Sequence, residues 1–171
     1  MFDPTAFENM KVVMQGALYD LDISGEIVIT DRNDLINMAK MSRCFELTFE
    51  LAEGNRRKIS AKIIMESQLG NLAAELLSDF MPKNLAGCEI ILQFLIHDTE
   101  VNEDFKAIEK TLQDIWGPKR KISQIVQYNP LAPNEKQVDF ITVEFDRVIR
   151  EEQIDDLVDM LEFMITTLRR L

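Results

Sequence analysis

The chain has 171 residues, of which 46% are hydrophobic and 29% charged, values close to those of folded globular proteins. Its 30 acidic residues outnumber 19 basic residues, so the net charge at pH 7 is −11. Such a charge repels phosphate backbones and anionic lipid surfaces, and we therefore expect neither a nucleic acid nor a membrane as partner. The length suits one domain, residues 1–171.

The N-terminus and the cysteines predict a cytoplasmic protein without disulfides. A secretory signal has a basic segment followed by an apolar segment. The first residues of this chain contain neither. The most apolar stretch, residues 90–96, is far shorter than the ~20 residues that cross a bilayer. Cys44 and Cys88 lie far apart and outside any C-x-x-C motif, so we expect two free thiols.

The first forty residues are predicted to form two strands and a short helix. Residues 11–21 and 26–30 are predicted as strands on either side of a turn at Ser24-Gly25. Residues 34–41 are predicted as a helix, which a preceding Asp or Asn could cap.

Residues 44–51 and 58–65 form the clearest predicted element, a β-hairpin. Apolar and polar residues alternate along both segments, which indicates strands with one buried and one solvated face. The apolar members are Phe45, Leu47, Phe49 and Leu51 in the first segment and Ile59, Ala61, Ile63 and Met65 in the second.

Residues 69–80 carry an apolar stripe with helical spacing, and we expect this stripe to pack on the core. Its members are Leu69, Leu72, Ala73, Leu76, Leu77 and Phe80. Residues 88–96 are almost continuously apolar, which favours a central strand covered on both faces.

The rest of the chain repeats these element types. Residues 102–116 are predicted as a helix, 122–128 and 138–145 as a strand pair, and 150–171 as a long C-terminal helix. Hairpins interleaved with helices indicate an α+β fold. We expect a mainly antiparallel sheet built from hairpins, with amphipathic helices packed on one face.

One run of polar residues suggests a metal site. His97, Asp98 and Glu100 follow the central strand, at a position where loops often carry function. An imidazole and carboxylates can bind a divalent ion and support a small metal-dependent enzyme. The alternative is a polar loop that caps the next helix, and this alternative is favoured because the sequence has no second histidine.

The C-terminal helix could bind a partner. Its apolar residues fit the a and d positions of a coiled coil over about three heptads. The candidates are Ile154, Leu157, Leu161, Met164 and Leu168. The competing interpretation, which we favour, is that the stripe covers the protein's own sheet.

The sequence contains no standard nucleotide-binding, serine-hydrolase or zinc-protease motif, and we expect no cofactor. The favoured hypothesis is a non-enzymatic interaction or regulatory protein, acting as a homodimer or with a protein partner. Besides the metal-dependent enzyme, the alternative is a ligand-sensing domain using Tyr19, Trp116 and Tyr128. The basic clusters at 56–58 and 119–121 are interpreted as solvated turns.

Overall fold

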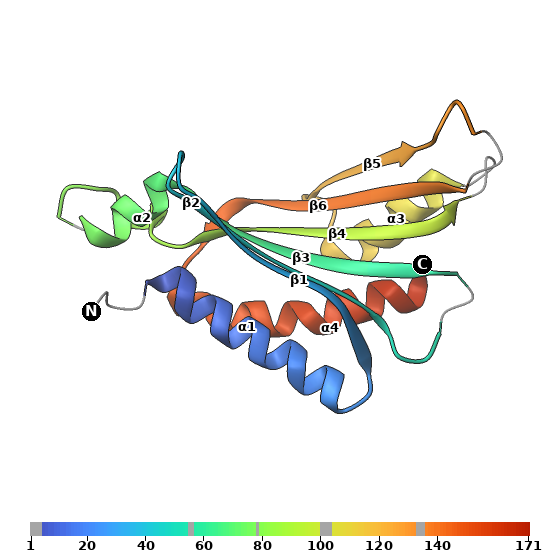
Figure 1. Ribbon diagram of the computed structural model, residues 1–171, viewed down its shortest axis with the longest axis horizontal. Coiled ribbons are helices and arrows are strands. Elements are labelled where there is room, and N and C mark those ends of the chain that lie inside the picture. The colour runs from blue at the N-terminus through green and yellow to red at the C-terminus, as the bar shows by residue number, and fades with distance from the viewer. Residues whose placement is uncertain (1–4, 55–56, 78, 100–103, 133–135) are drawn as a thin grey trace.

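The computed structural model describes residues 5–54, 57–77, 79–99, 104–132 and 136–171. Its centre is a six-stranded sheet in the order β1-β2-β3-β4-β6-β5, with every neighbouring pair antiparallel (Figure 1). The strands are β1 (Ile27–Asn37), β2 (Ser42–Leu51), β3 (Ile59–Ser67), β4 (Cys88–Thr99), β5 (Lys121–Gln127) and β6 (Gln137–Ile149). The predicted α+β class with a mainly antiparallel sheet is confirmed.

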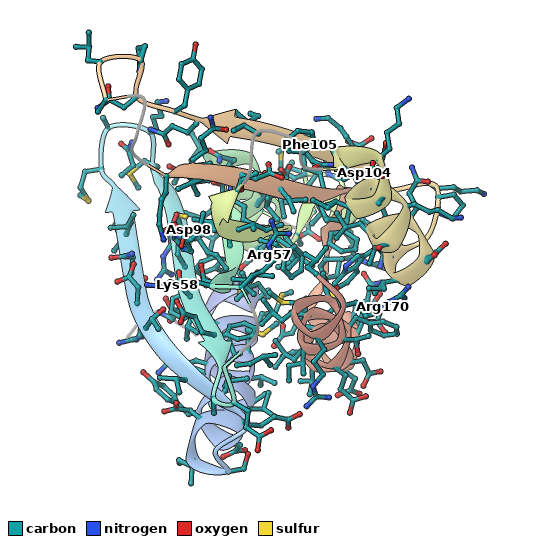
Figure 2. The ribbon with its side chains drawn as sticks, turned by 90° about the vertical axis from the view of Figure 1, so that its right-hand side faces the viewer. Arg57, Lys58, Asp98, Asp104, Phe105 and Arg170 are labelled. Atoms are coloured by element: carbon teal, nitrogen blue, oxygen red, sulfur yellow. The ribbon has the colours of Figure 1, made fainter. Side chains whose placement is uncertain are left out.

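Three long helices pack on one face of this sheet. Figure 2 shows α3 and α4 together on one side of the curved strands, and α1 contacts both α4 and β1. The helices are α1 (Ala6–Ile23), α2 (Leu69–Leu76), α3 (Phe105–Trp116) and α4 (Ile154–Arg170), with 3-10 turns η1 (Lys83–Leu85) and η2 (Glu151–Gln153). The predicted long C-terminal helix is therefore also present.

The core lies between the sheet and these helices because one face of each central strand is apolar. Neighbouring strands bring their apolar residues into rows across the sheet. One such row contains Leu47, Ile63, Leu92 and Val143, all fully buried. The predicted hairpin thus forms as β2 and β3, with its alternating apolar residues facing inward.

Strand β4 is central, as its sequence predicted, but the expectation that both of its faces are covered is wrong. Ile90, Leu92 and Phe94 face the helices and are buried. Ile91 and Leu95 point to the opposite face and are only partly buried. No described helix lies on that second face, so side chains of the neighbouring strands provide the shielding there.

The predicted strand at 11–21 is wrong, because these residues belong to helix α1. Phe7, Met10, Met14 and Leu18 recur with helical spacing and are buried against the sheet. The Thr5 side chain caps the helix by accepting a hydrogen bond from the Glu8 backbone N–H.

The predicted helix at 34–41 is also wrong, because β1 extends to Asn37 and a turn follows. The segment pairs with β2 and is an outer strand of the sheet, where polar residues are tolerated. Asp34 lies opposite Phe45 and accepts a hydrogen bond from Lys11 of α1. Strand pairing with β2 and the hydrogen bond from Lys11 of α1 thus override the local preference for a helix.

Candidate functional site

The structure places the predicted metal ligands at the end of β4, without forming a metal centre from the described residues. His97 pairs with Val138 of β6, and a bulge between His97 and Thr99 gives Asp98 a φ of 66°. The Asp98 carboxylate accepts a charged hydrogen bond from Lys136 at 2.5 Å. Figure 2 labels Asp98 at this end of the sheet.

Glu100 lies outside the described residues, so the three candidate ligands cannot be placed together. Within the described ranges, no three His, Cys, Asp or Glu side chains lie close enough to hold a metal ion. Metal binding at His97, Asp98 and Glu100 stays a prediction.

The apolar stripe of α4 packs on the protein's own sheet. Leu157, Leu161, Met164 and Leu168 are all buried in the core, and Ile154 packs against its edge. A partner could reach these side chains only if α4 left the sheet. Partner binding through this stripe therefore stays a prediction that the packing does not favour.

The three aromatic residues considered for ligand sensing come from three separate elements. Trp116 at the end of α3 packs edge-on against Phe145, with ring centroids 5.9 Å apart, and donates a hydrogen bond to Thr167 of α4. Tyr19 belongs to α1, whereas Tyr128 follows β5 and is exposed. Trp116 thus helps to join α3 to α4.

Both cysteines are free thiols of low reactivity. Cys88 is buried beside Met10, and Cys44 lies on β2 and is partly buried. Burial raises the pKa of Cys44 to about 11 and that of Cys88 to about 12, and the negative charge of nearby acidic side chains contributes to a smaller extent. Both therefore remain protonated at neutral pH.

Among the described residues, the largest set of exposed apolar side chains lies at one end of the sheet, which we call the α2 end. It combines the β1–β2 hairpin with α2 and the turns that follow α2. Its members, between 49% and 86% exposed, are Leu35, Ile36, Met38, Met41, Leu69, Leu76, Leu77 and Phe80.

The strand register explains why these two segments meet. Arg43, just after the β1–β2 turn, pairs with Ser67 at the end of β3, and α2 begins two residues later at Leu69. Figure 1 shows the β1–β2 turn and α2 at the same end of the sheet. A groove of about 560 Å³ opens at the hairpin side of this end. Its lining residues are Leu35, Ile36, Asn37, Met38, Ser42 and Cys44.

Most of the apolar stripe predicted at residues 69–80 is exposed and not packed on the core, which corrects that prediction: Leu69, Leu76, Leu77 and Phe80 are exposed, and Leu72 and Ala73 are half-buried. The helix ends at Leu76, and its two buried residues are Asn71 and Ala74. The Asn71 side chain accepts a hydrogen bond from the Gln68 backbone N–H and donates one to the Leu85 carbonyl. Polar bonds therefore hold the inner side of α2, whereas Leu69 and Leu76 face outward and Leu72 is half-buried.

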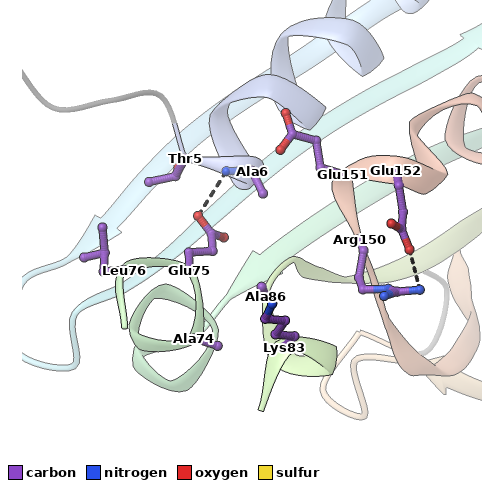
Figure 3. A pocket seen from close by; sticks show the side chains of 10 residues that line it. All are labelled: Thr5, Ala6, Ala74, Glu75, Leu76, Lys83, Ala86, Arg150, Glu151 and Glu152. Carbon is purple, nitrogen blue, oxygen red and sulfur yellow. Dashed lines mark hydrogen bonds and ion pairs between the residues drawn. The ribbon is translucent and has the colours of Figure 1, made fainter. Parts of the chain in front are cut away.

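A larger pocket of about 890 Å³ adjoins α2 on the side of α1 (Figure 3). Glu75 accepts a hydrogen bond from the Ala6 backbone N–H at 3.0 Å, and burial raises the pKa of this carboxyl. On the far wall Arg150 pairs with Glu152 at 2.5 Å. Lys83 and Glu151 complete a lining that contains charges of both signs.

The α2 end is nearly neutral in a strongly acidic chain. The segments 35–43 and 69–87 contain three cations, Lys40, Arg43 and Lys83, against two anions, Glu75 and Asp79. The whole chain has 19 cations against 30 anions. An acidic partner is therefore repelled less by these two segments than by the chain as a whole.

Comparison with protein-family models, with curated proteins and with solved structures finds no match to this chain. None of the helices formed by the described residues is long and apolar enough to cross a membrane.

Proposed function

We propose that this chain is a non-enzymatic interaction protein that binds another protein through the α2 end. The observation that carries the proposal is the concentration of eight exposed apolar side chains on two adjoining segments. Large contiguous apolar surfaces are uncommon on proteins that act alone, and they mark sites of protein association.

The composition of the α2 end supports a protein as the ligand. Leucine, methionine and phenylalanine supply the apolar centre, and methionine adapts its shape to different partner surfaces. Lys40, Asp79 and Lys83 are exposed beside that centre and can form a polar rim. An apolar centre within a charged rim is typical of protein–protein interfaces.

The direct test compares a double variant with a matched control. Leu76→Asp with Phe80→Asp introduces two carboxylates into the α2 end, whereas Val12→Asp introduces one on the exposed side of α1, where Val12 is 63% exposed. Tagged proteins are cross-linked in extracts of the producing cells, and the captured proteins are identified by mass spectrometry. We expect the wild type and Val12→Asp to capture the same partner and the double variant to lose it.

The double variant should fold normally, since both replaced side chains are more than half exposed. Its free energy of unfolding should stay within about 0.5 kcal/mol of the wild-type value. Capture of the same partner by a folded double variant would refute the proposal, as would the absence of any captured protein.

A further inference from the structure

The two outer strands of the sheet, β1 and β5, differ in how their free edges are protected. Strand β1 contains a bulge between Ile29 and Asp31, which interrupts its regular pairing. It also carries the charged residues Arg32 and Asp34, which bond to Gln15 and Lys11 of α1. Bulges and charged side chains at an edge prevent pairing with a further strand.

Strand β5 has no bulge, and its one charged residue, Lys121, lies at its first position. It pairs with β6 without a bulge over all seven of its residues, and it contains no proline. Among the described residues, the only backbone partner of β5 is β6, so its other edge is open. An open, regular edge is a template for a further strand.

Strand β5 carries apolar side chains on both faces of the sheet, among polar ones. Ile122 and Val126 point to the helix-covered face, where Ile122 lies beside Val143 of the core row. Ile125 points to the opposite face, next to Phe140, and is 65% exposed. Phe140 in turn lies beside Leu95 of β4, so an apolar row of three strands ends at Ile125.

We propose that the β5 edge binds the β5 edge of a second copy of this chain, forming a homodimer with one continuous sheet. The argument for a second copy is that β5 is complementary to itself in antiparallel orientation. With a twofold axis at Gln124, all seven residues pair, and Lys121 lies opposite Gln127 of the second copy. The two cations are thus kept apart.

The same register buries the apolar side chains of the edge against each other. Ile122 lies opposite Val126 of the second copy, and this contact occurs twice because of the symmetry. Ile125 lies opposite Ser123, which leaves room for the larger isoleucine side chain. Apolar and β-branched pairs of this kind stabilise antiparallel sheets.

The charge distribution also favours this approach of two acidic chains. Residues 117–128 contain three cations and no anion, in a chain of net charge −11. Arg120 lies over the Phe145 ring at 4.8 Å, and Lys121 pairs with Glu144 at 2.6 Å, so two of these cations are held close to β5. Two copies therefore meet at a part of the surface that is not acidic.

The first test is the mass of the wild type and of two lysine variants at tens of micromolar concentration. We expect the wild type to have twice the chain mass of 19.8 kDa in light scattering. Ile125→Lys places an unpaired charge in the joined sheet twice per dimer and should raise the dimer dissociation constant at least ~100-fold. The control Val28→Lys changes a half-exposed valine on the β1 edge and should leave the dimer intact.

The second test examines the register. Opposite residues in an antiparallel pair have Cα atoms about 4.5–5.5 Å apart, within the range of about 4.4–6.8 Å that a disulfide spans. In a Cys44→Ser background, Gln124→Cys should therefore form a disulfide-linked dimer under mild oxidation. Gln127→Cys should not, since its neighbour in the second copy is Lys121.

A monomeric wild type would refute the proposal, and so would a folded Ile125→Lys variant that remains dimeric. Equal cross-linking at positions 124 and 127 would refute the register. The α2-end double variant Leu76→Asp with Phe80→Asp should remain dimeric, because the β5 edge and the α2 end are separate surfaces. Failure of this proposal and failure of the proposed function are therefore distinguishable.

Discussion

At the scale of single residues, one buried cation joins α1 to the sheet. The Lys11 ammonium lies 2.8 Å from carboxylate oxygens of both Glu8 and Asp34, and the Lys11 side chain is only 11% exposed. Arg43 of β2 pairs with the other oxygen of Glu8 and stacks over the Phe7 ring at 4.9 Å. This network stabilises the position of α1 across β1 and β2.

Replacing Lys11 by alanine should destabilise the fold in a pH-dependent way. Burial works to raise the pKa of Glu8, but hydrogen bonds from Lys11 and Arg43 outweigh it and lower this pKa below its ordinary value of 4.5. The contribution of ionised Glu8 to stability is thus present above pH 4.5 and lost as the pH falls through the lowered pKa. At pH 7 we expect Lys11→Ala to reduce the free energy of unfolding by about 1–2 kcal/mol.

Urea unfolding at a series of pH values checks this expectation. The difference between wild type and Lys11→Ala should shrink below pH 4.5, because protonated Glu8 no longer attracts the ammonium. Lys106→Ala, which removes an exposed lysine on α3, should change stability by less than about 0.5 kcal/mol at every pH. A difference that is constant from pH 7 to pH 3 would show that Lys11 acts through packing alone.

At the scale of elements, the connection between η1 and β4 depends on a glycine. Gly87 has a φ of +151°, and a Cβ added there would lie 2.1 Å from the Ile149 backbone oxygen at the end of β6. Because the two backbones approach closely here, Cys88 at the start of β4 pairs with Ile149 at the end of β6. A residue with a Cβ therefore cannot replace Gly87 unless one of the strands moves.

Gly87→Ala should therefore reduce the free energy of unfolding by at least about 2 kcal/mol, measured by urea denaturation. Gly70→Ala in α2 is the matched control, since nothing lies within 4 Å of the added methyl group. It should leave stability unchanged or raise it by up to about 1 kcal/mol, because alanine favours a helix. Equal effects of the two changes would contradict the role given to Gly87.

The elements that could be predicted from the sequence are those whose pattern matches their burial. The hairpin of β2 and β3 alternates cleanly because one face is covered, and α4 has an apolar stripe because it covers the sheet. Helix α1 was missed because its exposed side carries Val12 and Val13, which favour strands. The first part of β1 was predicted as a strand at 26–30, but its second part was missed because Arg32, Asn33 and Asp34 bond to α1 and β2, contacts that no local pattern contains.

The candidate site was hidden for a related reason. The stripe at 69–80 has the same spacing whether it faces the core or the solvent. Its outward orientation follows from the Asn71 side-chain hydrogen bonds and from the end of α2 at Leu76. These contacts involve residues up to fourteen positions away, so spacing alone could not reveal them.

At the scale of the whole molecule, the net charge opposes any association of two copies. Each chain carries −11, and the dimer proposed through β5 works against that repulsion. Salt shortens the range of the repulsion, from about 30 Å at 0.01 M to about 8 Å at 0.15 M.

Raising the salt concentration over this range should therefore lower the dimer dissociation constant, measured by analytical ultracentrifugation. Ile125→Lys should stay monomeric at both salt concentrations, because its defect is the unpaired lysine in the sheet. Weakening of the wild-type dimer by salt would show instead that pairs of opposite charge hold the two chains together.

The bulge in β1 also limits how large an assembly can become. Thr30 is the extra residue between the pairs Ile29–Phe49 and Asp31–Thr48, and its hydroxyl donates a hydrogen bond to the Thr48 carbonyl. A sheet with two regular edges could add copies without end and grow into a fibre. Since β1 ends the sheet on one side, joining at β5 uses the last open edge, and growth stops at a closed particle of two chains.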